Sequence, residues 1–214
     1  MSDLIDFDAA FGPDEFAQAT GAWPERVAAV DRYRALLEEW NDRMNLVGPS
    51  AMAAFWRRHA YDSAQLLPLA PDAKVWADLG TGAGFPGIIL AILLKGREGA
   101  RVHLVESLAK RCRFLQTVVD ELALPAVIHN ARAESTGLSG IEIVTARACA
   151  PMDKLLGYAH PTLRGKARGL FLKGKDAEAE MAEAAKRWRF DMAMIPSKSD
   201  PSGRIVSITR LARV

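Results

Sequence analysis

A cluster of glycines separates two apolar segments in the stretch VWADLGTGAGFPGIILAILL, residues 75–94. Glycine adopts backbone conformations that other residues avoid, and it lets another molecule approach the backbone closely. The first apolar segment predicts a strand and the second a helix, and the loop between them lies where open parallel sheets bind ligands. We therefore expect a ligand close to the glycines, which are Gly80, Gly82, Gly84 and Gly87.

Two features indicate what this ligand carries. Pro86 suits the first turn of the predicted helix, where the N–H that proline lacks has no partner. The free N–H groups and the dipole at such a helix start favour a carboxylate or a phosphate. Glu106 ends the next predicted strand, a place from which a carboxylate binds ribose hydroxyls.

Nicotinamide or flavin dinucleotides and S-adenosylmethionine both meet these requirements. Residues 82–87, GAGFPG, match the dinucleotide pattern G-x-G-x-x-G. Counted from Gly80, however, the third glycine position holds Phe85, which is too bulky for close packing of helix on strand. Asp78 begins DLGTGAG, which has the methyltransferase form D-x-G-x-G-x-G. We favour S-adenosylmethionine, and a loop that serves only as a tight turn is the structural alternative.

The sequence also restricts the methyl acceptor. An amino-group methyltransferase usually has a Pro-Pro-aromatic motif, and no Pro-Pro occurs in the chain. Methylation of a pyrimidine carbon needs a cysteine nucleophile, and the one candidate, Cys149 in RACAP, is better explained as a small apolar residue at a strand end. An acceptor such as guanine N7 is already nucleophilic, so alignment in a dry site would suffice without a general base.

The elements that must position these residues follow from apolar periodicity. Residues 25–45 and 51–67 predict amphipathic helices, and residues 1–70 form an expected helical extension. From residue 71 to residue 214 we expect one compact domain, in which short apolar strands alternate with helices. The predicted strands are residues 75–79, 102–106, 126–129, 142–145 and 169–172, and the predicted helices are residues 86–94, 108–122, 152–160 and 177–188.

The C-terminal segment departs from this alternation. Residues 192–196 and 204–211 predict two strands joined by the turn-rich loop SKSDPSG, so we expect them to pair antiparallel. The predicted fold class is therefore α/β, Rossmann-like, with a mostly parallel seven-stranded sheet and an antiparallel terminal hairpin. Class I S-adenosylmethionine-dependent methyltransferases have such a closing hairpin.

Composition is consistent with a globular protein. Half of the 214 residues are hydrophobic and a quarter are charged, which is typical of a chain with a substantial core. Cys112 and Cys149 are too far apart to indicate a disulfide framework or a zinc site, so we expect a reducing cytoplasm and no metal. The acidic opening does not resemble a signal peptide, and the apolar run of residues 88–94 is too short to cross a membrane.

The net charge of +2 hides an uneven distribution. Residues 1–31 are acidic apart from Arg26, whereas residues 145–175 are basic apart from Asp153. A basic block of this kind favours either a surface that binds phosphates or a solvated rim.

Several motifs together resemble one family. WNDRMNLVG, RRHAYDS, ADLGTGAGFPGIILAI, VESLAKRCRFL, ARAES, TARACAP and LFLKG occur in this order between residue 35 and the C-terminus. They resemble the bacterial glucose-inhibited division protein B family, the 16S rRNA guanine-N7 methyltransferases. The resemblance implies S-adenosylmethionine as cofactor and a guanine in the decoding region of 16S rRNA as acceptor. The expected partner is 16S rRNA or the 30S subunit, and we expect the protein to be a monomer.

The resemblance also implies site residues. The cofactor would contact Gly80, Gly82, Gly84 and Phe85, with Glu106 on the ribose. Ala133 and Glu134 would lie on the adenine side. Arg147 would border cofactor and target base, and Lys173 at the end of the fifth strand would join it as a positioning residue in catalysis. The expected site residues are Gly80, Gly82, Gly84, Phe85, Glu106, Ala133, Glu134, Arg147 and Lys173, with no metal ligand among them.

Each assignment has a structural alternative. Arg147 could pair with Asp78 or Asp153, and Lys173 could belong to a solvated rim. His59 and Asp62 could suggest a metal pair, although hydrogen bonding between helices is favoured. For the whole protein, the alternatives are a non-catalytic RNA-binding module that keeps a cofactor-binding scaffold, and a nicotinamide-dependent oxidoreductase.

RNA geometry adds one expectation. Guanine N7 faces the major groove, which in A-form RNA is too deep and narrow for side chains. The target guanine must therefore be unpaired or distorted.

Overall fold

The computed structural model describes residue 7, residues 9–163 and residues 165–214. In this part of the chain a seven-stranded sheet has the order β3-β2-β1-β4-β5-β7-β6. The first five strands run parallel, and β7 pairs antiparallel with both β5 and β6. The strands are β1 Val75–Leu79, β2 Arg101–Glu106, β3 Ala126–Asn130, β4 Ile143–Arg147, β5 Arg168–Lys173, β6 Trp188–Pro196 and β7 Arg204–Arg213. The predicted fold class is confirmed.

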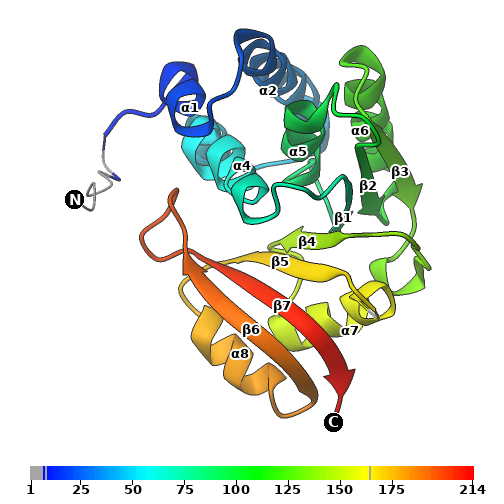
Figure 1. The fold of residues 1–214 in the computed structure, drawn as a ribbon. Coiled ribbons are helices and arrows are strands. Elements are labelled where there is room, and N and C mark those ends of the chain that lie inside the picture. Colours follow the sequence, from blue (N-terminus) through cyan, green and yellow to red (C-terminus); the bar gives the residue numbers. More distant parts are fainter. Residues whose placement is uncertain (1–6, 8, 164) are drawn as a thin grey trace.

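Helices cover both faces of the sheet (Figure 1). Those on one face are α1 Pro13–Thr20, α2 Pro24–Met44, α3 Pro49–Ala53, the π-helix η1 Phe55–Tyr61, α4 Asp62–Ala64, the 3-10 helix η2 Leu67–Leu69, α5 Gly87–Leu94 and α6 Ala109–Glu121. The other face is covered by α7 Met152–Leu163 and α8 Ala177–Ala184, and the 3-10 helix η3 Ala133–Ser135 follows β3. The sheet therefore lies between two helical layers.

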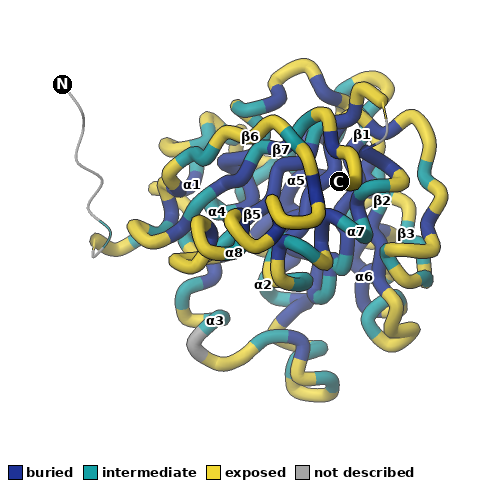
Figure 2. The backbone as a smooth tube through the Cα atoms, turned by 90° about the horizontal axis from the view of Figure 1, so that it is seen from below, coloured by how far each residue is buried: buried dark blue, intermediate teal, exposed yellow. Residues whose placement is uncertain are grey.

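The helical layers enclose two apolar cores. The strands β1, β2, β4 and β5 are mostly buried, whereas the edge strands β3 and β6 and the covering helices carry exposed residues (Figure 2). α5, with the sequence GIILAILL, is buried almost all round because α2 and α4 pack outside it while β1 and β2 lie beneath it. Even so, none of the described helices is long and apolar enough to cross a membrane.

The N-terminal helices share their core with the sheet. On α2, the buried side chains include Val30, Tyr33 and Leu37, and they belong to the same cluster as Trp76 of β1 and Ile88 of α5. Asn45 ends α2 in the left-handed conformation, with φ of 48°. The helical segment is thus packed directly on the layer that carries the glycine loop.

Several boundaries differ from the sequence predictions. The predicted helix at residues 51–67 is divided into α3, η1 and α4, because a π-helical segment from Phe55 to Tyr61 interrupts the α-helical hydrogen bonding. α3 begins at Pro49, two residues before the predicted start. α8 ends at Ala184, and Trp188, predicted to be helical, begins β6. α1 is not predicted by periodicity at all, and it buries only Phe16.

Candidate active site

The glycine loop connects β1 to α5 and has a left-handed backbone at alternate positions. The φ angles are 67° at Gly80, 61° at Gly82 and 109° at Gly84. A Cβ at Gly80 would meet Cys149 Sγ at 2.5 Å, and one at Gly84 would meet Ile88 Cγ1 at the same distance. A Cβ at Gly82 would meet no atom closer than 3.9 Å. Gly82 is therefore where the loop backbone is open to an incoming molecule.

Asp78 lies beneath this loop and is fully buried. Its Oδ2 accepts hydrogen bonds from Thr81 Oγ1 at 2.5 Å and from the Gly87 N–H at 2.8 Å. Within the described residues, its Oδ1 has no hydrogen-bond partner. Burial raises the pKa of this carboxyl group to about 6, against the opposing effect of its two hydrogen bonds.

The start of α5 differs from the sequence expectation. Pro86 is the N-cap, and the helix begins one residue later, at Gly87. The Gly87 N–H donates to Asp78, and the Ile88 N–H donates to the Gly84 carbonyl at 2.7 Å. These two groups are therefore not free for a ligand anion, because the protein supplies its own carboxylate there.

Glu106 ends β2 and reaches across to the glycine loop. Its Oε2 accepts the Gly82 N–H at 3.1 Å, and its Oε1 accepts the Leu108 N–H at 2.8 Å. The side chain is buried, and Arg111 approaches it at 3.6 Å. Oε1 also accepts from Ser107 Oγ at 3.5 Å, whereas Oε2 accepts only the Gly82 N–H among the described residues. A carboxylate oxygen has about two acceptor positions, so Oε2 keeps one beside Gly82.

The residues after β3 lie at the same edge of the sheet. Asn130 ends β3 and donates to the Glu106 carbonyl at 3.1 Å, which holds the ends of β2 and β3 together. Ala133 and Glu134 follow in η3, the first half-buried and the second exposed. Glu134 is close enough to Cys149 to influence its thiol.

Arg147 ends β4, and the N-terminal helical segment holds its guanidinium. One nitrogen, NH1, donates to the Arg58 carbonyl at 2.9 Å and to His59 Nδ1 at 2.6 Å. The same nitrogen lies 3.9 Å from Asp62 Oδ2. The guanidinium also covers the ring of Phe85 at 4.8 Å from its centroid, a cation–π contact. Arg147 thus joins the glycine loop to η1.

His59 and Asp62 act as partners of Arg147. Burial, with help from Arg147 and Arg58, lowers the pKa of His59 to about 3, so its imidazole is neutral and Nδ1 accepts the hydrogen bond. The His59 ring also stacks on Phe85 with 4.6 Å between centroids. Asp62 accepts a further hydrogen bond from Ser199 at 2.6 Å. Neither Asp78 nor Asp153 forms the ion pair of Arg147, because Asp153 pairs with Arg187 and Asp78 bonds the loop.

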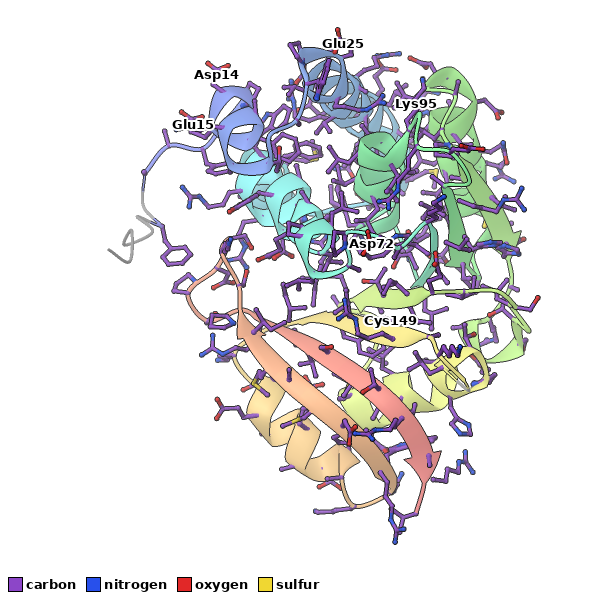
Figure 3. The ribbon with its side chains drawn as sticks, viewed as in Figure 1. Asp14, Glu15, Glu25, Asp72, Lys95 and Cys149 are labelled. Carbon is purple, nitrogen blue, oxygen red and sulfur yellow. The ribbon has the colours of Figure 1, made fainter. Side chains whose placement is uncertain are left out.

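Lys173 and Cys149 complete this edge of the sheet. Lys173 ends β5; its ammonium pairs with Glu180 at 2.6 Å and donates to the Ala150 carbonyl at 3.1 Å. Its side chain is only 8% exposed, so it is not part of a solvated rim. Cys149 lies beside β4 (Figure 3), and burial together with Asp78 and Glu106 raises the pKa of its thiol. The thiol is therefore protonated and a poor nucleophile.

Comparison with known proteins places this geometry in a family. The model of the family described as rRNA small subunit methyltransferase G matches residues 26–205. The chain belongs to this family. A ribosomal RNA small subunit methyltransferase G of Caulobacter vibrioides is 60% identical over 93% of this chain and 92% of the relative. Proteins of the same name from Caulobacter sp. strain K31 and Methylorubrum populi are 57% and 47% identical, covering 97% and 89% of this chain and 93% and 91% of theirs.

Solved structures resemble this methyltransferase G family member in fold. A putative O-methyltransferase from Klebsiella pneumoniae superposes with a TM-score of 0.59 at 12% identity, over 92% of this chain and 95% of that one. A mutant of MtNAS in complex with S-adenosylmethionine gives a TM-score of 0.57 at 14% identity, over 96% and 86% of the two chains. These similarities support the class I methyltransferase fold.

Several contacts in the site of this methyltransferase G family member are not predicted by its sequence. Tyr33 of α2 is fully buried and donates to the Ala83 carbonyl in the glycine loop at 2.6 Å. In the sequence, Tyr33 is one position of an amphipathic helix and gives no signal of this role. Asp78 had a signal, since it begins the D-x-G-x-G-x-G motif, but its unpartnered oxygen is visible only in the structure.

Proposed function

We propose that the chain is an S-adenosylmethionine-dependent methyltransferase that modifies N7 of a guanine in the 16S rRNA of the small ribosomal subunit. The observation that carries this proposal is the family match over residues 26–205, which includes the complete glycine loop. The chain also spans more than nine-tenths of the first Caulobacter relative, so the proposal concerns the same extent of protein.

The residues present fit the cofactor. Gly82 leaves an open approach to the loop backbone, and Glu106 beside it suits ribose hydroxyls. The unpartnered Oδ1 of Asp78 suits a positively charged amino group. We infer that Gly80, Gly82, Gly84, Phe85 and Glu106 hold the cofactor, with Ala133 and Glu134 beside its adenine. When bound, S-adenosylmethionine supplies a methyl group on a positively charged sulfur.

Catalysis then rests on positioning by this chain's own side chains. Guanine N7 has a free lone pair, so no proton has to be removed from it. His59 is neutral and already accepts from Arg147, and the Cys149 thiol is protonated, so neither acts as a base or a nucleophile. Arg147 would border both the cofactor and the base from its place over Phe85, and Lys173 would hold the loop after β4 through Ala150.

The partner is proposed to be 16S rRNA, free or in the 30S subunit, with the target guanine unpaired. We further propose residues 1–70 as a helical extension and residues 71–214 as the methyltransferase domain. The contact of Tyr33 with Ala83 supports the view that the extension serves the cofactor loop. Sedimentation would test the proposed monomer, and fractionation of cells would test the cytoplasmic location.

Two measurements separate this function from the alternatives. Calorimetric titration should show binding of S-adenosylmethionine and none of NAD(H), whereas a nicotinamide oxidoreductase requires the opposite. Incubation with radiolabelled S-adenosylmethionine should then transfer label to rRNA of unmethylated small subunits. Binding without any transfer to subunits or free rRNA would instead support the scaffold alternative.

A further inference from the structure

A cavity adjoins Arg147 at the end of β4. It occupies about 850 Å³, within the roughly 300–1,000 Å³ of ligand pockets. It opens at the ends of β4 and β5, and η1 and the loop between β6 and β7 form its other walls. Because Arg147 contacts both this cavity and Phe85, the cavity adjoins the proposed cofactor site.

Four carboxylates line the cavity, and three of them already have cationic partners. Asp62, Glu180 and Asp200 lie at 3.9 Å, 2.6 Å and 2.8 Å from these partners. The partners are Arg147, Lys173 and Arg58, respectively. Further hydrogen bonds reach each of the three carboxylates, for example from the Met152 N–H to Glu180 at 2.7 Å. Their acceptor positions are therefore largely engaged in holding the walls.

Asp176 is the fourth carboxylate and differs from the others. It is exposed at the N-cap of α8 and makes no side-chain capping hydrogen bond. No ion pair or hydrogen bond joins its carboxylate to another described residue. On another wall, Arg204 contacts only the Pro201 and Gly203 carbonyls and has no acidic partner in the described chain. One free anion and one uncommitted cation thus face the same cavity.

This pair matches the chemistry of a guanine nucleotide. Guanine presents N7 and O6 as acceptors on one edge, and its N1–H and 2-amino group are donors on the opposite edge. A carboxylate only accepts hydrogen bonds, so it suits the donor edge of guanine and disfavours adenine, whose N1 is an acceptor. A guanidinium suits the phosphate of the same nucleotide.

We propose that this cavity holds the acceptor guanine and that the Asp176 carboxylate selects it by accepting hydrogen bonds from N1–H and the 2-amino group. Arg204 binds the nucleotide's phosphate. The inference rests on the proposed function, since it presents N7 toward the glycine loop. Beyond that function, Asp176 is assigned the selection of the base that is methylated.

The proposal is tested by removing the 2-amino group of the guanine and the carboxylate of Asp176, separately and together. Small subunits are reconstituted with 16S rRNA that carries guanosine or inosine at the methylated position, because inosine lacks only the 2-amino group. For the wild-type protein, inosine should lower kcat/KM roughly tenfold or more, the effect of one hydrogen bond to a charged group. For Asp176→Ala the penalty should disappear, and affinity for S-adenosylmethionine should be unchanged.

Glu178→Ala is the matched control, because Glu178 is an exposed acid in the first turn of the same helix and does not line the cavity. It should keep the full inosine penalty. Asp176→Asn is a second variant that preserves side-chain shape, and it should also lose most of the penalty. The proposal is overturned if wild-type protein shows no inosine penalty, or if the Asp176 variants keep it. Absence of methylation by wild-type protein on guanosine RNA would instead contradict the proposed function.

Discussion

Replacing Gly82 with alanine tests the glycine loop with little disturbance of the fold. At φ of 61° an alanine costs about 1–2 kcal/mol. No clash adds to this cost, because the new Cβ would lie 3.9 Å from its nearest neighbour. A loss of this size leaves a domain of ordinary stability folded. For a chain of this length it lowers Tm by about 2–8 °C.

The same substitution should strongly weaken cofactor binding. The added methyl group occupies the open space through which a ligand reaches the loop backbone, and it lies beside Glu106. We expect the Kd for S-adenosylmethionine to rise at least roughly tenfold, which corresponds to about 1.4 kcal/mol.

Gly21 provides a matched control. It ends α1 with φ of 66°, and a Cβ there would have no atom within 4 Å. Gly21→Ala should therefore lower Tm about as much as Gly82→Ala and leave the Kd unchanged. Thermal unfolding and calorimetric titration of both variants give the comparison. Normal affinity in Gly82→Ala would remove the glycine loop from the cofactor site.

Three further predictions concern charged groups. Arg147→Ala should reduce the rate of methyl transfer roughly a hundredfold, because cofactor and base would no longer be aligned. The free energy of unfolding should change much less. An unchanged turnover rate would mean that Arg147 has only a structural role. The pKa of Asp78 is about 6, and its ionised form would bind the positively charged amino group. Affinity for S-adenosylmethionine should therefore fall as the pH drops below about 6. Calorimetry on Asp78→Asn should show a weaker affinity that lacks this pH dependence. His59 has a pKa of about 3 when folded and roughly 6.5 when unfolded, so acidification from pH 7 to 5 favours the unfolded state. Between pH 7 and pH 5, the free energy of unfolding measured in urea should fall by about 2 kcal/mol more for the wild type than for His59→Gln. An equal fall in the two proteins would mean that His59 is not buried as a neutral imidazole.

The positions of many site residues could be predicted because of parallel topology. Glu106, Arg147 and Lys173 end three parallel strands, and parallel strands bring their carboxyl ends to one edge of the sheet. Alternation of strands and helices was therefore enough to place them near the glycine loop.

Contacts between distant segments could not be predicted in this way. His59 and Arg147 are 88 residues apart, and Tyr33 and Ala83 are 50 apart. Apolar periodicity shows that a helix has a buried side but does not say which loop that side meets. It also assumes 3.6 residues per turn, so the π-helix that presents Arg58 and His59 to Arg147 escaped it.

The most direct test of the central claim is the identity of the methylated nucleoside. Small subunits from cells that lack this gene are incubated with the protein and radiolabelled S-adenosylmethionine, and the rRNA is digested to nucleosides. We predict that the label appears in 7-methylguanosine. With S-adenosylmethionine well below the wild-type Kd, labelling should fall roughly tenfold or more when Gly82→Ala replaces the wild-type protein. Label in any other nucleoside, or equal labelling by the two proteins, would contradict the account.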